Sequence, residues 1–417
     1  MTEMLPPSAV PVEGDLLLGG CSLKTIADRF GTPAYVLDET ALRERARRFR
    51  DAFTSLHPKT TVCFASKAYP SVSVIGLLVE EGLGSDVVGA GELMMALAAG
   101  ADPAGIVMHG NAKSDLDIQA ALDAGIGRIV VDGFDDIDRI AALATAVTPV
   151  LLRVSPGIES ATHSALATGG VGAKFGIPVD QVPAAIARIE REPLIRLDGL
   201  HAHIGSQIFE LDQFEAAVAA LATLPRFGVY DLGGGLGVPY VPGDPIVTVE
   251  RWAERLVRAV HRHLGADVEL LVEPGRSLVA PVQVTAYRIV TIKHGVRTHV
   301  AVDGGMGDNL EPSLYGQRFA PLVVGKWRGP TQTVELVGRH CESGDVLVSG
   351  VDLVEPEVGD LVVVPVTGAY CFTMSNNYNG ALKAPVVFCR DGVARLAVRR
   401  ETYDELLARE VGVGAAD

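Results

Sequence analysis

Residues 61–100 read TVCFASKAYPSVSVIGLLVEEGLGSDVVGAGELMMALAAG. Two short apolar runs, Thr61–Ser66 and Gly84–Val88, are each followed by a longer stretch with apolar residues at helical spacing, Val72–Glu81 and Gly91–Ala99. This pattern predicts strands and helices in alternation. Strands joined in this way run parallel, because each helix carries the chain back to the starting edge of the sheet.

The same alternation continues to about residue 275. Six further strands are predicted, at Ile106–His109, Arg128–Val131, Pro149–Val154, Leu197–His203, Val229–Leu232 and Val268–Val272. The helices between them are predicted at Leu116–Ala124, Asp135–Ala146, Val179–Arg191, Asp212–Leu224 and Val249–Leu264, with a long polar loop after Val154. Eight such units favour an α/β fold with a (β/α)8 barrel of the TIM type, and a doubly wound open sheet is the competing architecture.

The pattern of the sequence changes after Pro281. Short Val-rich segments between Gly and Asp turns predict an all-β domain, with strands at Val282–Lys293, Thr298–Val302, Gln332–Val337, Asp360–Pro365, Ala384–Cys389 and Ala394–Arg399. The first residues of the chain are too few to fold alone, so we expect them to join this domain. The predicted parts are an N-terminal segment, 1–42, a barrel, 43–281, and a β-sandwich or barrel-like domain, 282–417.

Composition limits the partners and the location. A formal net charge of −15 argues against binding to nucleic acid or to an anionic membrane, because both need a basic surface. No apolar run reaches the ~18 residues that span a bilayer. The N-terminus lacks the basic and apolar regions of a signal peptide, so we expect a cytoplasmic protein. Five widely spaced cysteines without a CxxC pair do not suggest a disulfide framework or a zinc site.

Ionisable residues gather where the predicted barrel strands end. In chain order these ends carry Lys67, Asp86, His109, Asp132, Arg153, His203, Gly233 and Glu273. Catalytic groups of a (β/α)8 barrel lie at the carboxyl ends of its strands, whereas a purely structural barrel needs no charges there. We therefore expect an active site at this face.

Three of these positions suggest a phosphorylated cofactor that is bound covalently. Burial lowers the pKa of a lysine amine, which suits imine chemistry at Lys67. The glycine run 233–237 lets backbone N–H groups approach a phosphate after strand seven, where barrels often bind one. Taken singly, Lys67 also fits a lysine that extends into solvent, and the glycine run also fits a tight turn.

Glu273 ends the last predicted strand, and Arg276 follows it by three residues. A buried carboxylate is costly unless it is paired, and a pyridinium nitrogen would be a suitable partner. Arg276 could bind a phosphate or carboxylate through both of its terminal nitrogens, or it could simply pair with Glu273. His201 and His203 are predicted on one face of a strand, but no third metal ligand has suitable spacing. We therefore expect His203 to lie against a flat ring, with Ser206 donating to a phosphate, and we expect no metal.

The chain resembles the diaminopimelate decarboxylases, which belong to the fold-type III pyridoxal phosphate-dependent decarboxylases. The resemblance spans nearly the whole sequence, from Pro33 to Thr402. Its motifs include Ala65-Ser66-Lys67-Ala68, His203-Ile204-Gly205-Ser206-Gln207, the glycine run, Glu273-Pro274-Gly275-Arg276 and Cys341-Glu342-Ser343-Gly344-Asp345. Read by position alone, the last motif would be only a turn between strands.

The resemblance implies a homodimeric enzyme with shared active sites that converts meso-2,6-diaminopimelate to L-lysine and CO2. Lys67 would bind pyridoxal 5'-phosphate covalently, His203 would stack on its ring, and Glu273 would keep its pyridine nitrogen protonated. The other cofactor-binding residues implied are Asp86, Ser206, Gly234, Gly235, Gly275, Arg276 and Tyr370. The partner subunit would contribute Cys341 as a catalytic proton donor. The substrate-binding residues implied are Arg276, Glu311, Tyr315, Glu342 and Tyr370.

One departure from the family pattern affects the substrate. The segment before Leu314-Tyr315-Gly316 usually carries an arginine that binds the distal carboxylate of diaminopimelate, and here that position is Glu311. A carboxylate there favours a substrate whose far end is an amine or a neutral polar group. The alternatives are therefore a decarboxylase of another basic or conjugated amino acid on the same scaffold, and a non-catalytic regulatory homologue. A racemase is disfavoured by the Glu273–Arg276 and Cys341–Asp345 motifs.

Overall fold

A computed structural model describes residues 2–158 and 173–412 of the chain. The chain forms two compact units. One unit contains Leu42–Val238 and Pro245–Val279, and the other contains Met1–Ala41, Pro239–Asp244 and Ala280–Asp417. Within the described residues, no helix is both long and apolar enough to cross a membrane.

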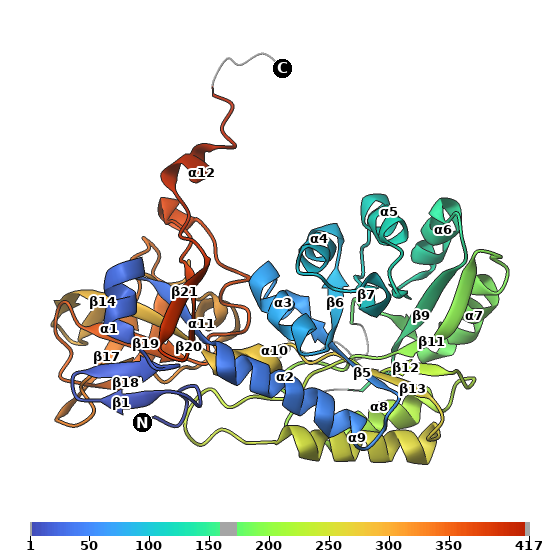
Figure 1. Cartoon of the computed structure of the whole chain (residues 1–417), viewed down its shortest axis with the longest axis horizontal. Helices are drawn as coiled ribbons and strands as arrows, with labels where there is room; N and C mark the ends of the chain where they lie inside the picture. Colours follow the sequence, from blue (N-terminus) through green and yellow to red (C-terminus); the bar gives the residue numbers. More distant parts are fainter. Residues whose placement is uncertain (1, 159–172, 413–417) are drawn as a thin grey trace. The chain divides into compact units, whose positions relative to one another are not determined.

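The first unit contains a closed barrel of eight parallel strands (Figure 1). The strands are β5 (Thr60–Ala65), β6 (Gly84–Val88), β7 (Ile106–His109), β8 (Arg128–Val131), β9 (Thr148–Ser155), β11 (Ile195–His201), β12 (Val229–Asp231) and β13 (Glu269–Val272). They pair in chain order, and β13 pairs with β5, which closes the ring. This closure confirms the barrel and excludes the open doubly wound sheet.

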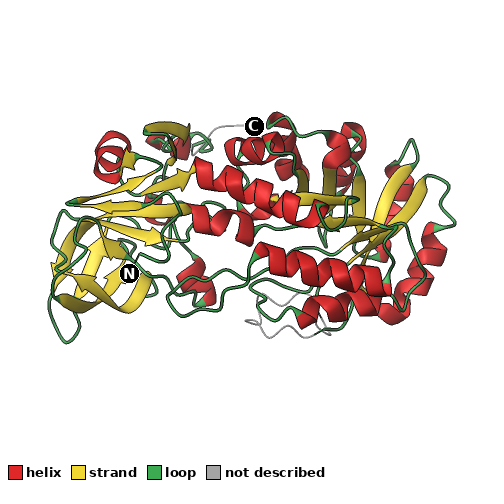
Figure 2. Cartoon of the chain, turned by 60° about the horizontal axis from the view of Figure 1, so that its bottom comes forward, coloured by secondary structure: helices red, strands yellow, loops and turns green. Residues whose placement is uncertain are grey.

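Helices follow the strands around the barrel and are drawn in red in Figure 2. They are α2 (Glu39–Thr54), α3 (Val72–Glu80), α4 (Ala90–Ala98), α5 (Asp115–Ala124), α6 (Phe134–Leu143), α7 (Val182–Ile189), α8 (Asp212–Leu221), α9 (Val249–His263) and the short α10 (Arg276–Val279). Seven of them lie within a few residues of their predicted positions. The polar loop predicted after Val154 falls largely outside the described residues.

Packing within the barrel unit follows the apolar pattern of the sequence. One buried cluster takes one residue from each of six strands, which places it inside the barrel: Cys63, Val107, Val130, Leu151, Val229 and Leu271. Trp252 of α9 is fully buried and packs edge-on against Phe49 and Phe53 of α2 and Phe214 of α8. Aromatic edges in this arrangement add to the stabilisation from burial. They explain why the highly charged helix α2, which was not predicted, is held in place.

The second unit is built mainly of strands. It contains a small sheet of β1 (Val10–Val12), β2 (Asp15–Leu18) and β3 (Cys21–Ser22), next in sequence to helix α1 (Leu23–Phe30). The larger sheet contains β4 (Ala34–Asp38), β14 (Gln283–Lys293), β15 (His299–Val302), β16 (Leu322–Val323), β17 (Thr331–Val337), β18 (Val346–Val354), β19 (Leu361–Pro365), β20 (Val386–Arg390) and β21 (Val393–Val398). The helices α11 (Glu311–Tyr315) and α12 (Tyr403–Leu407) belong to the same unit.

The N-terminal segment completes this larger sheet, as predicted. Strand β4 pairs antiparallel with β14 on one side and parallel with β20 on the other, so it lies inside the sheet. All five residues of β4 are buried. Strands β16 and β18 were not predicted. Gly350, with a φ of 62°, lies inside β18 and weakens its strand pattern in the sequence.

Candidate active site at the carboxyl ends of the barrel strands

Lys67 lies directly after strand β5, in a single 3-10 turn formed by Ser66–Ala68. The turn is held against the end of β13, because Ala65 N–H donates to the carbonyl oxygen of Pro274 at 3.3 Å. A side chain at Gly275 would place its Cβ 3.0 Å from the Cβ of Ala65 and 3.2 Å from that of Ala68. Any larger residue would push the lysine turn away by a few tenths of an ångström, so the absence of a side chain lets the last strand approach this turn closely.

The glycine run after β12 also has steric causes. A Cβ on Gly234 would lie 2.1 Å from the carbonyl oxygen of Glu273, and one on Gly235 would lie 2.5 Å from that of Gly205. The backbone N–H of Gly234 donates to His203 Nδ1 at 3.2 Å. The loop therefore lies directly against the ends of two neighbouring strands, with its backbone polar groups near His203. A backbone this close can present N–H groups to a phosphate.

Glu273 follows β13 and is 6 % exposed. The His109 Nε2–H donates to Glu273 Oε1 at 2.5 Å, and His201 Nε2 lies 3.5 Å from Glu273 Oε2. Burial raises the pKa of Glu273, but the charge and the hydrogen bond of His109 outweigh it and hold that pKa well below its usual range. Glu273 is thus a buried carboxylate that stays ionised because it has a partner in His109.

The neighbouring groups differ in their charge state. Burial lowers the pKa of His201 to about 3, so its ring is neutral. Burial, with the positive charges of Lys67 and Arg153, also lowers the pKa of His203 well below its usual value. Burial raises the pKa of Asp86, although the nearby charge of His109 opposes the effect. These shifts gather at one face of the barrel, as they do at functional sites.

Two further strand ends complete the charged ring. Arg153 Nη1 lies 3.3 Å from Asp132 Oδ1, and the Arg153 guanidinium lies 4.5 Å from the centre of the Phe175 ring. Asp132 Oδ2 also accepts from the backbone N–H of Gly176 at 3.0 Å. Arg276 Nε donates to Ser206 Oγ at 3.2 Å, which brings together two residues predicted to bind a phosphate.

The structure adds Asp231 to the site, which sequence reasoning missed. The ligating atoms of His109, His201, Asp231 and Glu273 all lie within 4.8 Å of one another. The sequence offered no third metal ligand beside the histidine pair, and the fold brings such groups in from other strands. However, atoms that share a zinc ion at about 2.1 Å are roughly 3.4 Å apart in tetrahedral geometry. The 2.5 Å contact between His109 and Glu273 is therefore a direct hydrogen bond, and we interpret the cluster as a hydrogen-bonded network.

The other predicted site residues belong to the second unit, where three segments meet. Ser313 Oγ of α11 donates to the carbonyl oxygen of Gly344 at 2.9 Å, and Cys341 N–H donates to Asn379 Oδ1 at 2.7 Å. Cys341 and Glu342 are exposed in the turn between β17 and β18, and Tyr315 and Tyr370 are half-buried. Glu311 is only 1 % exposed. Five residues predicted from distant motifs thus lie on neighbouring segments of one unit.

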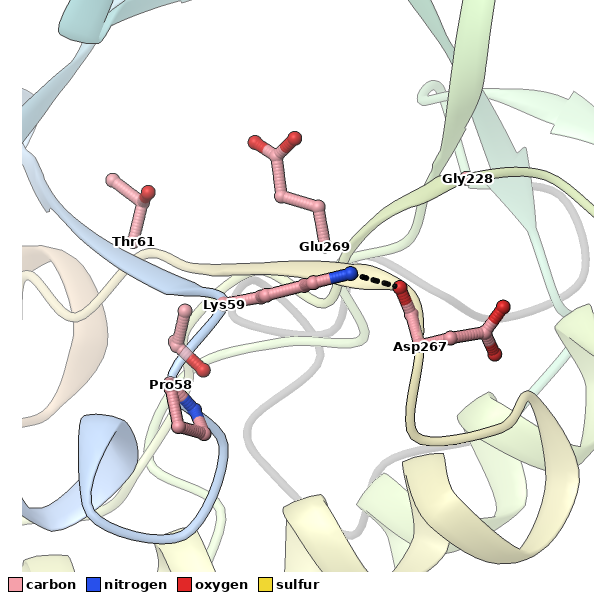
Figure 3. Close-up of a pocket in the computed structure, with 7 residues that line it drawn as sticks. Pro58, Lys59, Thr61, Gly228, Asp267 and Glu269 are labelled. Carbon is pink, nitrogen blue, oxygen red and sulfur yellow. Dashed lines mark hydrogen bonds between the residues drawn. The ribbon is translucent and has the colours of Figure 1, made fainter.

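A hollow of about 530 Å³ lies at the amino ends of the barrel strands (Figure 3). Lys59 Nζ donates there to the carbonyl oxygen of Asp267 at 2.9 Å, and Glu269 lies nearby. This end of a barrel serves stability in enzymes of this fold. The hollow is therefore separate from the candidate site, and its residues serve as controls.

Comparison with known proteins agrees with this geometry. Residues 39–280 match the family model described as pyridoxal-dependent decarboxylase, pyridoxal binding domain. The diaminopimelate decarboxylase of Actinosynnema pretiosum subsp. auranticum is 45 % identical over 95 % of this chain and 93 % of its own length. That of Bacillus subtilis is 40 % identical over 94 % of both chains.

A solved structure is similar over nearly the whole chain. The diaminopimelate decarboxylase of M. jannaschii, in complex with L-lysine, has a TM-score of 0.92 and 28 % identity, and the match covers 98 % of both chains. The resemblance therefore includes both units, and the family's cofactor is pyridoxal phosphate. This chain belongs to the diaminopimelate decarboxylase family of pyridoxal phosphate-dependent amino-acid decarboxylases.

Proposed function

We propose that the chain removes CO2 from meso-2,6-diaminopimelate to give L-lysine. The observation that carries the activity is Glu273, a buried carboxylate that His109 holds in its ionised form. Such a group matches the positive charge of a protonated pyridine nitrogen. The choice of substrate is supported by relatives named diaminopimelate decarboxylase that are 37–45 % identical to this chain.

The described residues fit pyridoxal phosphate. Lys67 supplies the amine that binds the cofactor covalently, and Asp86 lies near it in the site. Ser206 and Arg276, already in contact, would hold the phosphate together with the glycine backbone. The backbone groups belong to Gly234, Gly235 and Gly275, where a Cβ would meet a neighbouring strand end within 3.0 Å.

Bound pyridoxal phosphate supplies an electron sink for the pair of electrons that departing CO2 leaves on the substrate's α-carbon. Glu273 keeps a proton at the pyridine nitrogen, which makes the sink effective. His203, neutral and held at Nδ1 by the Gly234 N–H, would present a flat face to the ring. The Lys67 amine would also be able to move protons at the substrate's α-carbon.

We further propose a cytoplasmic homodimer with shared active sites. Cys341 and Glu342 are exposed in one turn, so they are available to a second copy of the chain. In this arrangement Cys341 gives a proton to the α-carbon, Glu342 and Tyr315 contact the substrate, and Tyr370 contacts both substrate and cofactor.

Glu311 favours a second candidate function, the decarboxylation of an amino acid with a cationic or neutral far end. It is 1 % exposed and begins helix α11, four residues before Tyr315. A buried carboxylate beside a substrate site would attract an amine and repel a carboxylate. Arg318, a nearby alternative cation, is paired with Asp244 at 3.1 Å and is exposed.

CO2 release from a panel of amino acids tests both candidates, and labelling tests the cofactor. Borohydride should bleach the visible band of the purified protein, and peptide mapping should find the adduct on Lys67. Lys67→Ala should lose the band and nearly all turnover, whereas Lys59→Ala at the opposite end of the barrel should keep both (Figure 3). An adduct on any other lysine would contradict the assignment.

A further inference from the structure

The Asp231 side chain ends strand β12 beside the Glu273 carboxylate. It is 0 % exposed. Its Oδ1 accepts from the backbone N–H of Gly233 at 2.9 Å, but its buried Oδ2 meets no donor among residues 2–158 and 173–412. One of its carboxylate oxygens lies within 4.8 Å of ligating atoms of Glu273, His109 and His201. One oxygen of Asp231 is therefore satisfied, and the other is buried without a donor in this part of the chain.

Two carboxylates this close together in a buried site cannot both be ionised at low cost, so they share a proton. Burial raises the pKa of Asp231 well above its usual value, and the charge of Glu273 and a hydrogen bond with it raise it further. Glu273 is shifted in the opposite direction, because the charge and the hydrogen bond of His109 outweigh the effect of its burial. The shared proton therefore resides on Asp231.

The remaining groups around the Asp231 and Glu273 pair also favour a proton on Asp231. Asp86 adds negative charge that disfavours a second carboxylate ion at Asp231. His201 is neutral and 1 % exposed, and within the described part of the chain neither of its ring nitrogens has a hydrogen bond within normal limits. His109 gives its hydrogen bond to Glu273. The donor that Oδ2 lacks can be supplied by a proton on Asp231 itself.

We propose that Asp231 is a positioning residue that remains protonated and donates its Oδ2–H to the Glu273 carboxylate, so that the buried pair carries one negative charge. The role rests on the proposed function, in which Glu273 is the partner of the pyridine nitrogen. A neutral Asp231 then adds no second negative charge beside the Glu273 carboxylate. The Glu273 carboxylate is held by His109 from β7 and by Asp231 from β12, which fixes its orientation toward the ring.

Infrared spectroscopy tests the protonation state directly. The difference spectrum between the wild-type holoenzyme and Asp231→Asn at neutral pH should contain the carbonyl band of a protonated carboxylic acid, lost in the variant. Asp198→Asn is the matched control, since Asp198 lies on the neighbouring strand β11 and pairs with Arg196 at 2.7 Å. The control spectrum should contain only the bands of an ionised carboxylate. A wild type without the protonated band at Asp231 would overturn the proposal.

Cofactor affinity tests the positioning role. Asparagine keeps an N–H donor in the place of the acid O–H, so Asp231→Asn should keep the dissociation constant for pyridoxal phosphate within about threefold. Leucine has a similar shape and no donor, so Asp231→Leu should raise that constant about ten- to a hundredfold. If Asp231 were ionised, asparagine and leucine would weaken binding alike, and that result would also overturn the proposal.

The two readouts separate this proposal from the proposed function. If Asp231→Leu does not fold, the infrared band and the asparagine variant still show whether Asp231 is protonated. A wild-type protein without a visible band that borohydride bleaches would contradict the cofactor assignment. The infrared band of Asp231 would still be measurable in that protein, because it is a property of the chain.

Discussion

The role proposed for Glu273 depends on the charge of its side chain more than on its shape. Glutamine is isosteric with glutamate but carries no charge, so Glu273→Gln should retain the cofactor while its ring nitrogen loses the proton. We expect the decarboxylation rate to fall by about two to three orders of magnitude, the range seen when a preorganised electrostatic group is removed. The measurement is kcat for CO2 release, with the cofactor quantified by absorbance.

Glu269→Gln provides the matched control for this change. Glu269 begins the same strand, β13, and its partner is Arg128 at 3.0 Å, at the amino end of the barrel (Figure 3). Its substitution should leave kcat nearly unchanged. A near-normal rate in Glu273→Gln would show that another group protonates the ring nitrogen.

A charge reversal at Glu311 tests the choice between the two candidate substrates. Unlike charges about 4 Å apart attract by about 4 kcal/mol at an effective dielectric constant of 20, and reversing one sign turns this attraction into repulsion. Glu311→Arg should therefore raise kcat/KM for meso-diaminopimelate and lower it for substrates with a cationic far end, such as lysine and ornithine. Glu357→Arg, an exposed charge reversal in the same unit, should change neither value. A wild type that already prefers diaminopimelate, with no gain in Glu311→Arg, would mean that Glu311 does not face the substrate.

At the scale of elements, the two ends of β12 offer a test of the glycine loop. Gly234→Ala would place a Cβ 2.1 Å from the Glu273 carbonyl oxygen, so the loop must move away from β13. We expect a loss of about 1–3 kcal/mol in the free energy of unfolding, the usual cost of overpacking, and weaker cofactor binding. Gly228→Ala, just before the same strand, would meet nothing within 4 Å and should change neither. Normal cofactor binding in Gly234→Ala would contradict a role for this loop in holding the phosphate.

The helices and strands were predicted accurately where a single hydrophobic periodicity dominates the sequence. The barrel strands are short apolar runs, and their predicted ends lie within two residues of the observed ones. Helix α2 was missed because charges hide its narrow apolar face of Leu42, Ala46, Phe49 and Phe53. Strand β18 was missed because Gly350 breaks its pattern. Local sequence does not reveal that Trp252 or a neighbouring strand compensates for these defects.

At the scale of the whole molecule, the sequence predicts which residues lie at the barrel face, but not which of them touch. Lys67, His203 and Glu273 could be named because each ends a strand. The protonation state of Glu273 could not be predicted, since it depends on His109, which is 164 residues away along the chain. Asp231 was missed for the same reason. The role of a carboxylate inside an apolar run cannot be inferred until the residues on the neighbouring strand are known.

The assembly prediction follows from the separation of the site residues between two units. Lys67 belongs to the barrel unit and Cys341 to the β unit. If a two-fold symmetric dimer builds each site from the barrel of one chain and Cys341 of its partner, Lys67→Ala and Cys341→Ala chains are inactive alone. A mixed dimer then contains one site with both groups intact. Random exchange makes half of the dimers mixed, so the mixture should regain about a quarter of the wild-type activity.

The control mixture combines Lys67→Ala with Glu273→Gln, whose altered residues both lie in the barrel unit. Every barrel in that mixture carries one defect, so it should recover nothing beyond the residual activity of the Glu273→Gln chains. Subunit exchange is confirmed by native mass spectrometry of the two tagged chains. If exchange is complete and the Lys67→Ala and Cys341→Ala mixture stays inactive, each site is built within one chain, because every site then contains one of the two defects.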